Sequence, residues 1–235
     1  MLCCALSAAS PPHIGARLSP GSRDTVVLLH GLNRSSRSMR DMADALRREG
    51  YAVISCDYPS RSTDIATLTA DLFGKLDPRL KSADTVHFVT HSMGGILLRA
   101  YLQDHTIPNL GRVVMLGPPN GGSEVVDKLG AFKLYRWING PAGAQLGTGP
   151  DSVPQQLKPP AFELGVIAGD RSVNPLLSLL IPARDDGKVA VARAKTAGMR
   201  DFICLHVTHT FMMNNRQVIN QTRHFLNTGT FQKDI

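Results

Sequence analysis

The chain has 235 residues, of which 43% are hydrophobic and 19% are charged, and its formal net charge at pH 7 is +7. These values are typical of a globular protein with a substantial core, and they exclude collagen-like and low-complexity chains. No apolar run reaches the roughly 18 residues that a membrane-spanning helix requires. We therefore expect one principal domain.

Five arginines account for much of the charge early in the chain: Arg34, Arg37, Arg40, Arg47 and Arg48. One interpretation is attraction to an anionic surface, such as lipid headgroups or nucleic acid. The other is the solvated face of a helix, which we favour because no nucleic-acid-binding motif accompanies the arginines. We expect no nucleic-acid partner, and peripheral contact with an anionic lipid surface stays open. Nothing in the sequence indicates the oligomeric state.

Residues 1–22 are expected to form an N-terminal tail before a domain at 23–235. The tail is apolar and rich in small residues, but it lacks the basic segment of a signal peptide. The sequence as written favours the cytoplasm, whereas a truncated signal peptide would indicate a secreted or periplasmic protein. The four cysteines show no spacing typical of a metal site or disulfide framework.

Apolar runs alternate with helical patterns along most of the chain. Buried strands are expected at 24–31, 51–59, 86–89, 111–119, 163–170 and 201–209. Helices are expected at 35–50, 63–76 and 214–229, and another follows Ser92 directly. This alternation predicts an α/β fold with a mainly parallel sheet and helices on both faces.

The alternation breaks between residues 118 and 163, where glycine and proline are frequent. One helical pattern, near 124–139, contains Trp137, the only tryptophan. We interpret 118–163 as a small cap insertion over the sheet. A second irregular stretch, 171–187, separates the last two strands.

Polar side chains follow the expected strands where each strand ends. Ser92 follows the third strand, Asp170 and later Asp186 follow the fifth, and His209 follows the sixth. Open parallel sheets bind ligands at the carboxyl ends of their strands. A serine hydroxyl becomes a useful nucleophile when a neighbouring base takes its proton, so this set of side chains indicates nucleophilic catalysis.

The sequence around Ser92 predicts a tight turn between a strand and a helix. Such a turn pushes the serine oxygen outward, and it needs small residues two positions before and after because the two backbones nearly touch. Gly94 meets this requirement, whereas Thr90 stands where glycine is usual. We therefore expect the local packing at Thr90 to differ.

Four motifs resemble the α/β-hydrolase fold family, and specifically its bacterial lipase-like serine esterases. They are LLHGL (28–32), HSMGG (91–95), DDGKV (185–189) and VTHTFMMNN (207–215). They occur in the family's order, and the resemblance covers about residues 25–231.

The resemblance implies a role for each of five residues. Ser92 would be the nucleophile, His209 the general base and then acid, and Asp186 the carboxylate that orients His209. The backbone N–H groups of Leu32 and Met93 would form the oxyanion hole. No metal and no organic cofactor is implied.

Two aspartates compete for the place beside His209. Asp170 directly follows the apolar VIAG run at 166–169, where many members of the family carry their acid. We predict Asp186, because an Asp-Gly-x-Val turn lets the carboxylate reach the histidine loop and because lipase-like members have this pattern. Asp170 precedes Arg171, and a salt bridge or a capping role is its simpler interpretation.

The predicted function is hydrolysis of carboxylic esters, from small molecules or lipids, through an acyl-enzyme on Ser92. A small cap favours short to medium acyl chains. An acyltransferase with the same three residues is the main alternative. A non-catalytic binding protein is disfavoured, because it would be expected to lack one of them.

Several neighbouring residues have plain structural interpretations. We expect Ser123 to cap the following helix, Asp185 to face solvent, and His206 to lie inside a strand. His91 is expected to pack beside Ser92, and His30 to shape the turn before Leu32.

Overall fold

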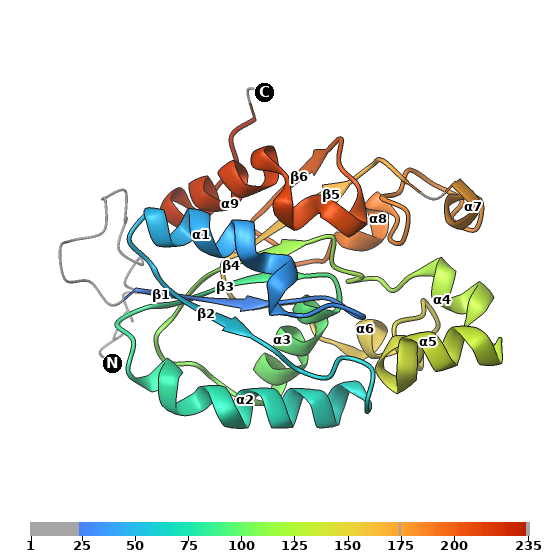
Figure 1. Cartoon of the computed structure of the whole chain (residues 1–235), viewed down its shortest axis with the longest axis horizontal. Coiled ribbons are helices and arrows are strands. Elements are labelled where there is room, and N and C mark those ends of the chain that lie inside the picture. Colours follow the sequence, from blue (N-terminus) through green and yellow to red (C-terminus); the bar gives the residue numbers. More distant parts are fainter. Residues whose placement is uncertain (1–23, 174, 234–235) are drawn as a thin grey trace, which may run out of the picture.

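Six strands form one sheet in the order β2-β1-β3-β4-β5-β6, and each neighbouring pair is parallel. The computed structural model describes residues 24–173 and 175–233 (Figure 1). The expected tail at 1–22 lies outside the described residues. The strands are β1 (Thr25–Leu29), β2 (Ala52–Cys56), β3 (Val86–His91), β4 (Leu110–Leu116), β5 (Leu164–Gly169) and β6 (Asp201–Leu205).

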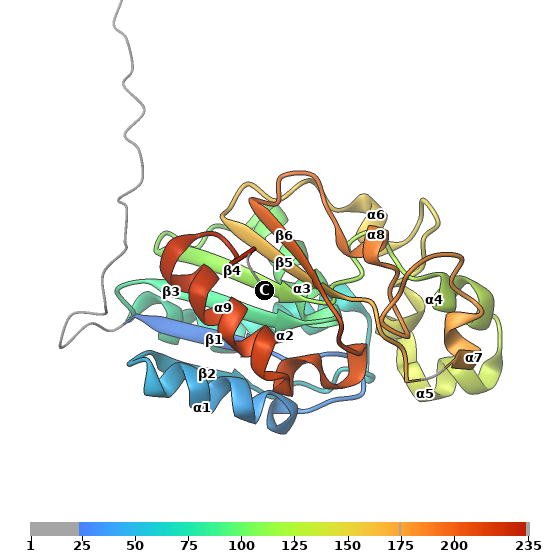
Figure 2. The ribbon, with the colours of Figure 1, turned by 90° about the horizontal axis from the view of Figure 1, so that it is seen from above.

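Four long helices cover the two faces of the sheet (Figures 1 and 2). They are α1 (Arg40–Arg48) and α9 (Arg216–Thr228) on one face, and α2 (Ile65–Lys81) and α3 (Met93–Asp104) on the other. The predicted α/β class, with a parallel sheet between two layers of helices, is confirmed.

The strand β1 shows why its sequence is apolar throughout. Val26 and Leu28 pack toward α1 and α9, whereas Val27 and Leu29 pack toward α2 and α3. All four side chains are almost completely buried. A strand covered on both faces alternates between two apolar layers, so it has no polar side.

The remaining helices are short or lie beyond the sheet. They are η1 (Ser36–Met39), α4 (Glu124–Leu129), α5 (Lys133–Ala144), α6 (Val153–Gln156), α7 (Pro175–Ser178), α8 (Val191–Ala194) and η2 (His209–Asn214). Figures 1 and 2 show α4, α5 and α7 together beyond the carboxyl ends of the strands. The two irregular stretches of the sequence meet there, since Val125, Ile181 and Ala190 share one small apolar cluster.

Two of the predicted boundaries were wrong by four or five residues. The helix predicted at 63–76 runs to Lys81 through Pro78, because its buried stripe continues from Leu76 to Leu80. The strand predicted at 201–209 ends at Leu205. His206 is therefore exposed instead of lying inside a strand.

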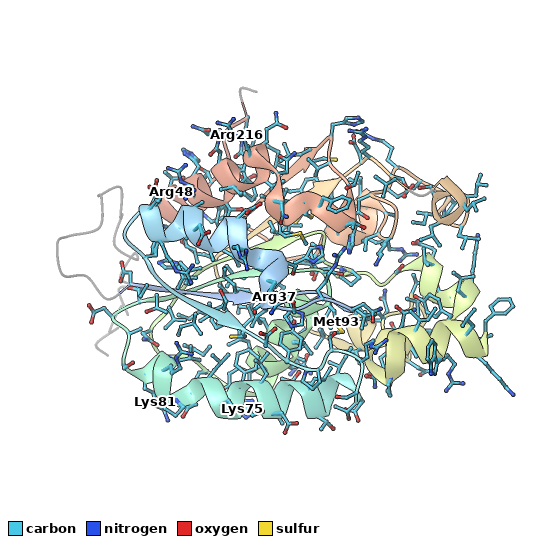
Figure 3. The ribbon with its side chains drawn as sticks, in the orientation of Figure 1. Arg37, Arg48, Lys75, Lys81, Met93 and Arg216 are labelled. Carbon is cyan, nitrogen blue, oxygen red and sulfur yellow. The ribbon has the colours of Figure 1, made fainter. Side chains whose placement is uncertain are left out.

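Basic side chains point outward from opposite sides of the molecule. In Figure 3, Arg48 and Arg216 project from α1 and α9, whereas Lys75 and Lys81 project from α2 on the other side. All four residues are exposed. Within the described ranges, no helix is both long and apolar enough to cross a bilayer.

Candidate active site

Ser92 occupies the turn between β3 and α3 in a strained backbone conformation. Its φ is 53° and its ψ is −123°, and among the described residues only Asn33 shares a positive φ without being glycine. The Ser92 N–H donates to the carbonyl of Leu116 at 2.8 Å, and the Gly95 N–H donates to the Ser92 carbonyl at 3.0 Å. Strain of this kind persists only where the surrounding structure enforces it, and it is common at functional sites.

Close packing behind Ser92 explains the glycines that follow it. A Cβ atom on Gly94 would lie 2.8 Å from the carbonyl oxygens of Leu29 and His30, which is too close for any side chain. A Cβ atom on Gly95 would lie 3.1 Å from Thr90 Oγ1. Gly95 thus leaves space for the threonine that replaces the usual glycine. Thr90 Oγ1 is buried and has no hydrogen-bond partner among the described residues.

Ser92, His209 and Asp186 form one hydrogen-bonded array. His209 Nε2 lies 3.0 Å from Ser92 Oγ, and His209 Nδ1 lies 2.8 Å from Asp186 Oδ2. The His209 backbone N–H also donates to the Asp186 carbonyl at 3.0 Å. All three residues are buried. An array of this kind can move a proton from the hydroxyl to the imidazole.

The 185–189 loop holds the Asp186 carboxylate in place. Asp186 Oδ1 accepts the backbone N–H groups of Lys188 at 3.1 Å and Val189 at 2.9 Å, which leaves Oδ2 for His209. Gly187 adopts a φ of 98°, which glycine tolerates best. The carboxylate is therefore oriented before any substrate binds.

Asp170, the competing aspartate, lies elsewhere and does not contact His209. Its carboxylate forms an ion pair with Arg184 and lies 3.0 Å from His206 Nδ1. Of the two aspartates considered from the sequence, the structure brings only Asp186 to His209.

Gly117, at the end of β4, leaves room for this array. Its φ is 53°, and a Cβ atom there would lie 3.0 Å from Asp186 Oδ2 and 3.1 Å from His209 Nδ1. Gly117 was not predicted to contribute to the site. Its position directly after an apolar strand was the available signal.

His91 supports His209 from behind. His91 Nε2 lies 3.0 Å from the His209 carbonyl oxygen, and the two rings lie 4.9 Å apart. Burial lowers the pKa of His91 well below its usual value, so the ring stays neutral and donates its Nε2–H to that carbonyl. His91 Nδ1 has no hydrogen-bond partner among the described residues.

His30 and Tyr58 shape the turn after β1. Their rings stack at 3.9 Å, and the Tyr58 hydroxyl donates to the His30 carbonyl. His30 Nδ1 lies 2.8 Å from the Gly31 carbonyl, and burial lowers the His30 pKa. A Cβ atom on Gly31 would lie 3.1 Å from Ser92 Cβ, so glycine lets this turn approach the serine. Tyr58 was not found from the sequence, because its partner is 28 residues away.

Ser92 and His209 open into a cavity of about 260 Å³. Its walls are mainly apolar, from Leu32, Val125, Val126, Leu129, Tyr135, Leu146, Leu177 and Val189. Arg34 and Lys188 also line it. The 118–163 segment supplies most of the apolar wall.

Two expectations near the cavity were wrong. The Ser123 side chain does not cap α4 but donates to the Lys188 carbonyl at 2.7 Å, which ties the 118–163 segment to the 185–189 loop. Asp185 is only 9% exposed, because its carboxylate accepts the Ser178 hydroxyl at 2.8 Å and the Gly187 N–H at 2.7 Å. Both corrections arise from contacts between loops that are distant in sequence.

Arg99 anchors the base of the 118–163 segment to α3. It is buried and donates to Asn120 Oδ1 at 3.0 Å and to the carbonyls of Leu157 and Lys158 at 3.2 and 3.1 Å. Burial lowers its pKa to about 10. This role could not be predicted, because Arg99 lies within an otherwise apolar helical pattern.

Within residues 24–173 and 175–233, no group of three or more His, Cys, Asp or Glu side chains is arranged to hold a metal ion. The two cysteines of the described residues, Cys56 and Cys204, are both free thiols.

Several solved structures share this fold. The chain is similar to the mature form of the Bacillus licheniformis lipase BlEst2, with 21% identity and a TM-score of 0.73 over 88% of this chain and 93% of that one. A metagenomic carboxyl esterase has 20% sequence identity to this chain and a TM-score of 0.64, over 80% of this chain and 65% of that one. The phospholipase PlaB from Legionella pneumophila has 18% sequence identity to this chain and a TM-score of 0.61, over 73% of this chain and 45% of that one. Because all three sequence identities are below 25%, these similarities show a shared fold and nothing more.

No curated protein sequence matches the chain. The sequence pattern of the alpha/beta hydrolase family matches residues 26–216, which is most of the chain and includes the LLHGL, HSMGG, DDGKV and VTHTFMMNN motifs. The chain therefore belongs to the alpha/beta hydrolase family.

Proposed function

We propose that the protein hydrolyses carboxylic esters through an acyl-enzyme on Ser92. The observation that carries this proposal is the buried array in which His209 lies 3.0 Å from Ser92 Oγ and 2.8 Å from Asp186 Oδ2. Each distance is within the range required for a nucleophile and its base. The array opens into the apolar cavity, so an ester carbonyl can reach the serine.

The reaction would proceed in two halves. In the first, Ser92 Oγ attacks the acyl carbon while His209 Nε2 takes its proton, and His209 then gives that proton to the departing alcohol oxygen. In the second, a water molecule attacks the acyl-enzyme by the same route and releases the acid. Asp186 would keep the proton on His209 Nδ1 and stabilise the imidazolium as it forms.

The negative charge that develops on the ester carbonyl oxygen must be stabilised by hydrogen-bond donors. We assign this role to the backbone N–H groups of Met93 and Leu32. Met93 begins α3, whose N-terminus favours negative charge. Leu32 follows the turn that His30 and Tyr58 brace, and it lines the cavity.

The cavity favours short to medium acyl chains. Its volume of about 260 Å³ lies just below the roughly 300–1,000 Å³ of typical small-molecule sites. We therefore expect p-nitrophenyl butyrate to be hydrolysed faster than p-nitrophenyl palmitate.

A fluorophosphonate probe and a p-nitrophenyl ester series test the proposed function. We expect covalent labelling at Ser92, ester turnover, and the free acid as the product even when an alcohol is added. Transfer of the acyl group to the added alcohol would instead identify an acyltransferase. If the probe labels nothing and no ester is hydrolysed, only a binding role would remain.

A further inference from the structure

Two cationic side chains line the cavity that contains Ser92. Arg34 lies between β1 and η1, and Lys188 lies in the 185–189 loop, two residues after Asp186. The two side chains thus reach the same cavity from opposite ends of the sequence. The other wall residues of the cavity are apolar or uncharged, apart from the imidazoles of His91 and His209.

Neither cation is neutralised by a carboxylate. Among the described residues, no acidic oxygen lies within 4.0 Å of the Arg34 guanidinium or the Lys188 ammonium, whereas other cations form ion pairs, such as Arg112 with Glu163 at 2.8 Å and Arg193 with Glu124 at 2.8 Å. Within the described part of the chain, the one hydrogen bond of the Arg34 guanidinium is from Nη2 to the Thr210 carbonyl, at 3.3 Å. Arg34 therefore keeps most of its N–H donors for a ligand.

The charge of Asp186 acts on Lys188, but the Asp186 carboxylate is already hydrogen-bonded to other groups. Asp186 Oδ1 accepts two backbone N–H groups, and Oδ2 contacts His209. The Lys188 backbone is fixed on both sides, because its N–H donates to Asp186 and its carbonyl accepts Ser123 Oγ. The ammonium is thus carried by a rigid loop beside the cavity.

The two cations also repel each other. Partial removal of water by the surrounding protein, followed by the Arg34 charge, lowers the pKa of Lys188, although Asp186 opposes the shift. Like charges that face one cavity repel each other when neither forms an ion pair with a carboxylate, and an anion bound between them would relieve the repulsion.

We propose that Arg34 and Lys188 bind an anionic group, a carboxylate or a phosphate, carried by the ester that Ser92 attacks. This inference rests on the proposed function and adds the class of substrate. Arginine suits such groups because its planar N–H donors match two oxygens at once, and lysine adds a point charge. The apolar walls would hold the uncharged part of the same molecule.

The anionic group could belong to either side of the ester. On the alcohol side, 4-butyryloxybenzoate carries a carboxylate, and 4-butyryloxybenzamide is its neutral counterpart. On the acyl side, mono-p-nitrophenyl glutarate carries the carboxylate, and p-nitrophenyl valerate is neutral. The pair that shows the larger preference for the anion identifies the side.

The test compares kcat/KM for each anionic ester with that for its neutral counterpart. We expect Arg34→Gln and Lys188→Gln each to lower this ratio about 10-fold, since a hydrogen bond to a charged group is lost. Added salt should lower the ratio in the wild type more than in the variants. Each variant is used only if its Tm is close to that of the wild type.

Arg37→Gln and Lys75→Gln are matched controls. Both side chains are exposed and neither lines the cavity. Both residues are labelled in Figure 3. The two variants remove the same charges, so they report any general effect of the protein's net charge. Their ratios should stay within about 2-fold of the wild type, because charges that do not reach the cavity are well screened from a ligand bound in it.

The outcomes separate the two proposals. Unchanged ratios in Arg34→Gln and Lys188→Gln, with normal hydrolysis of neutral esters, would overturn the anion site and leave the proposed function standing. If the wild type hydrolyses no ester, the proposed function fails. Calorimetric titration of Ser92→Ala protein with 4-butyryloxybenzoate and 4-butyryloxybenzamide then decides the anion site without turnover. The site is supported if the benzoate binds more tightly than the benzamide and if adding Arg34→Gln abolishes this preference. Equal binding of the two compounds rejects it.

Discussion

The carboxyl edge of the sheet and the 118–163 segment above it are built differently. At the sheet edge, Ser92, Asp186 and His209 are at most 9% exposed. The Ser92 N–H is hydrogen-bonded to β4, and Asp186 is hydrogen-bonded to His209 and to the 185–189 loop. In the segment, Leu134 and Trp137 of α5 are 67% and 76% exposed. Reacting groups thus lie on the rigid layer, whereas groups that contact the rest of a substrate lie on a loosely packed one. Changes at the edge should alter turnover, and changes in the segment should alter substrate preference.

The largest effect is expected from Ser92→Ala. The change removes one hydroxyl at the turn and leaves the strands intact, so the protein should still fold. We expect kcat for p-nitrophenyl butyrate to fall by a factor on the order of 10³ to 10⁶. Circular dichroism and Tm provide the folding control. Near-normal turnover by the folded variant would show that another residue is the nucleophile.

The second test distinguishes the two aspartates. Asp186→Asn should lower kcat by about 10² to 10⁴ with little change in KM, because the carboxylate no longer holds the proton on His209 Nδ1. Asp170→Asn is the matched control. It should cost far less in kcat, since Asp170 pairs with Arg184 and His206 instead. If Asp170→Asn lost most of its kcat while Asp186→Asn kept nearly the wild-type kcat, the assignment would be reversed.

Gly117→Ala should have an intermediate effect. The added methyl group would lie 3.0 Å from Asp186 Oδ2 and 3.1 Å from His209 Nδ1, so one of them must move. A small displacement at a reacting centre costs about 10- to 100-fold in kcat. Gly229→Ala is the control, because Gly229 also has a positive φ, of 80°, but ends α9 away from the site. If both variants lose activity equally, backbone strain rather than contact with the array is responsible.

Much of the sheet edge could be predicted from the sequence. Ser92 directly follows an apolar strand, and His30 and His209 stand close to the ends of two others, so the order of the chain already places these residues at one edge. Asp186 was harder to predict, because it lies 17 residues beyond Gly169, the last residue of β5. The Asp-Gly-x-Val turn was the only local signal for it.

The residues that the sequence did not reveal act through distant partners. Arg99 reaches Leu157, and Ser123 reaches Lys188, across 58 and 65 residues. Ser123 also stands where a capping residue is expected, and that local signal favoured the wrong role. Local patterns report on strands, helices and turns, whereas contacts between loops appear only once the chain is folded.

The smallest expected effect concerns the 118–163 segment itself. Leu129, at the end of α4, is half-buried and lines the cavity. Leu129→Ala removes part of that wall and enlarges the cavity. It should therefore raise kcat/KM for p-nitrophenyl octanoate relative to that for p-nitrophenyl butyrate. An increase of about 3- to 10-fold in this ratio is expected, since each newly buried CH₂ group is worth about 0.8 kcal/mol, which is roughly 4-fold.

The control for Leu129→Ala is Leu134→Ala, which removes the same atoms from the exposed side of α5, where the residue does not line the cavity. It should leave the octanoate-to-butyrate ratio unchanged. Because neither leucine contacts the Ser92 array, butyrate turnover should stay within a few-fold of the wild type in both variants. A loss of kcat in Leu129→Ala comparable to that in Gly117→Ala would mean that the segment positions the reacting groups, and the division between the two regions would fail. An unchanged ratio in both variants would mean that the acyl chain lies along a different wall of the cavity.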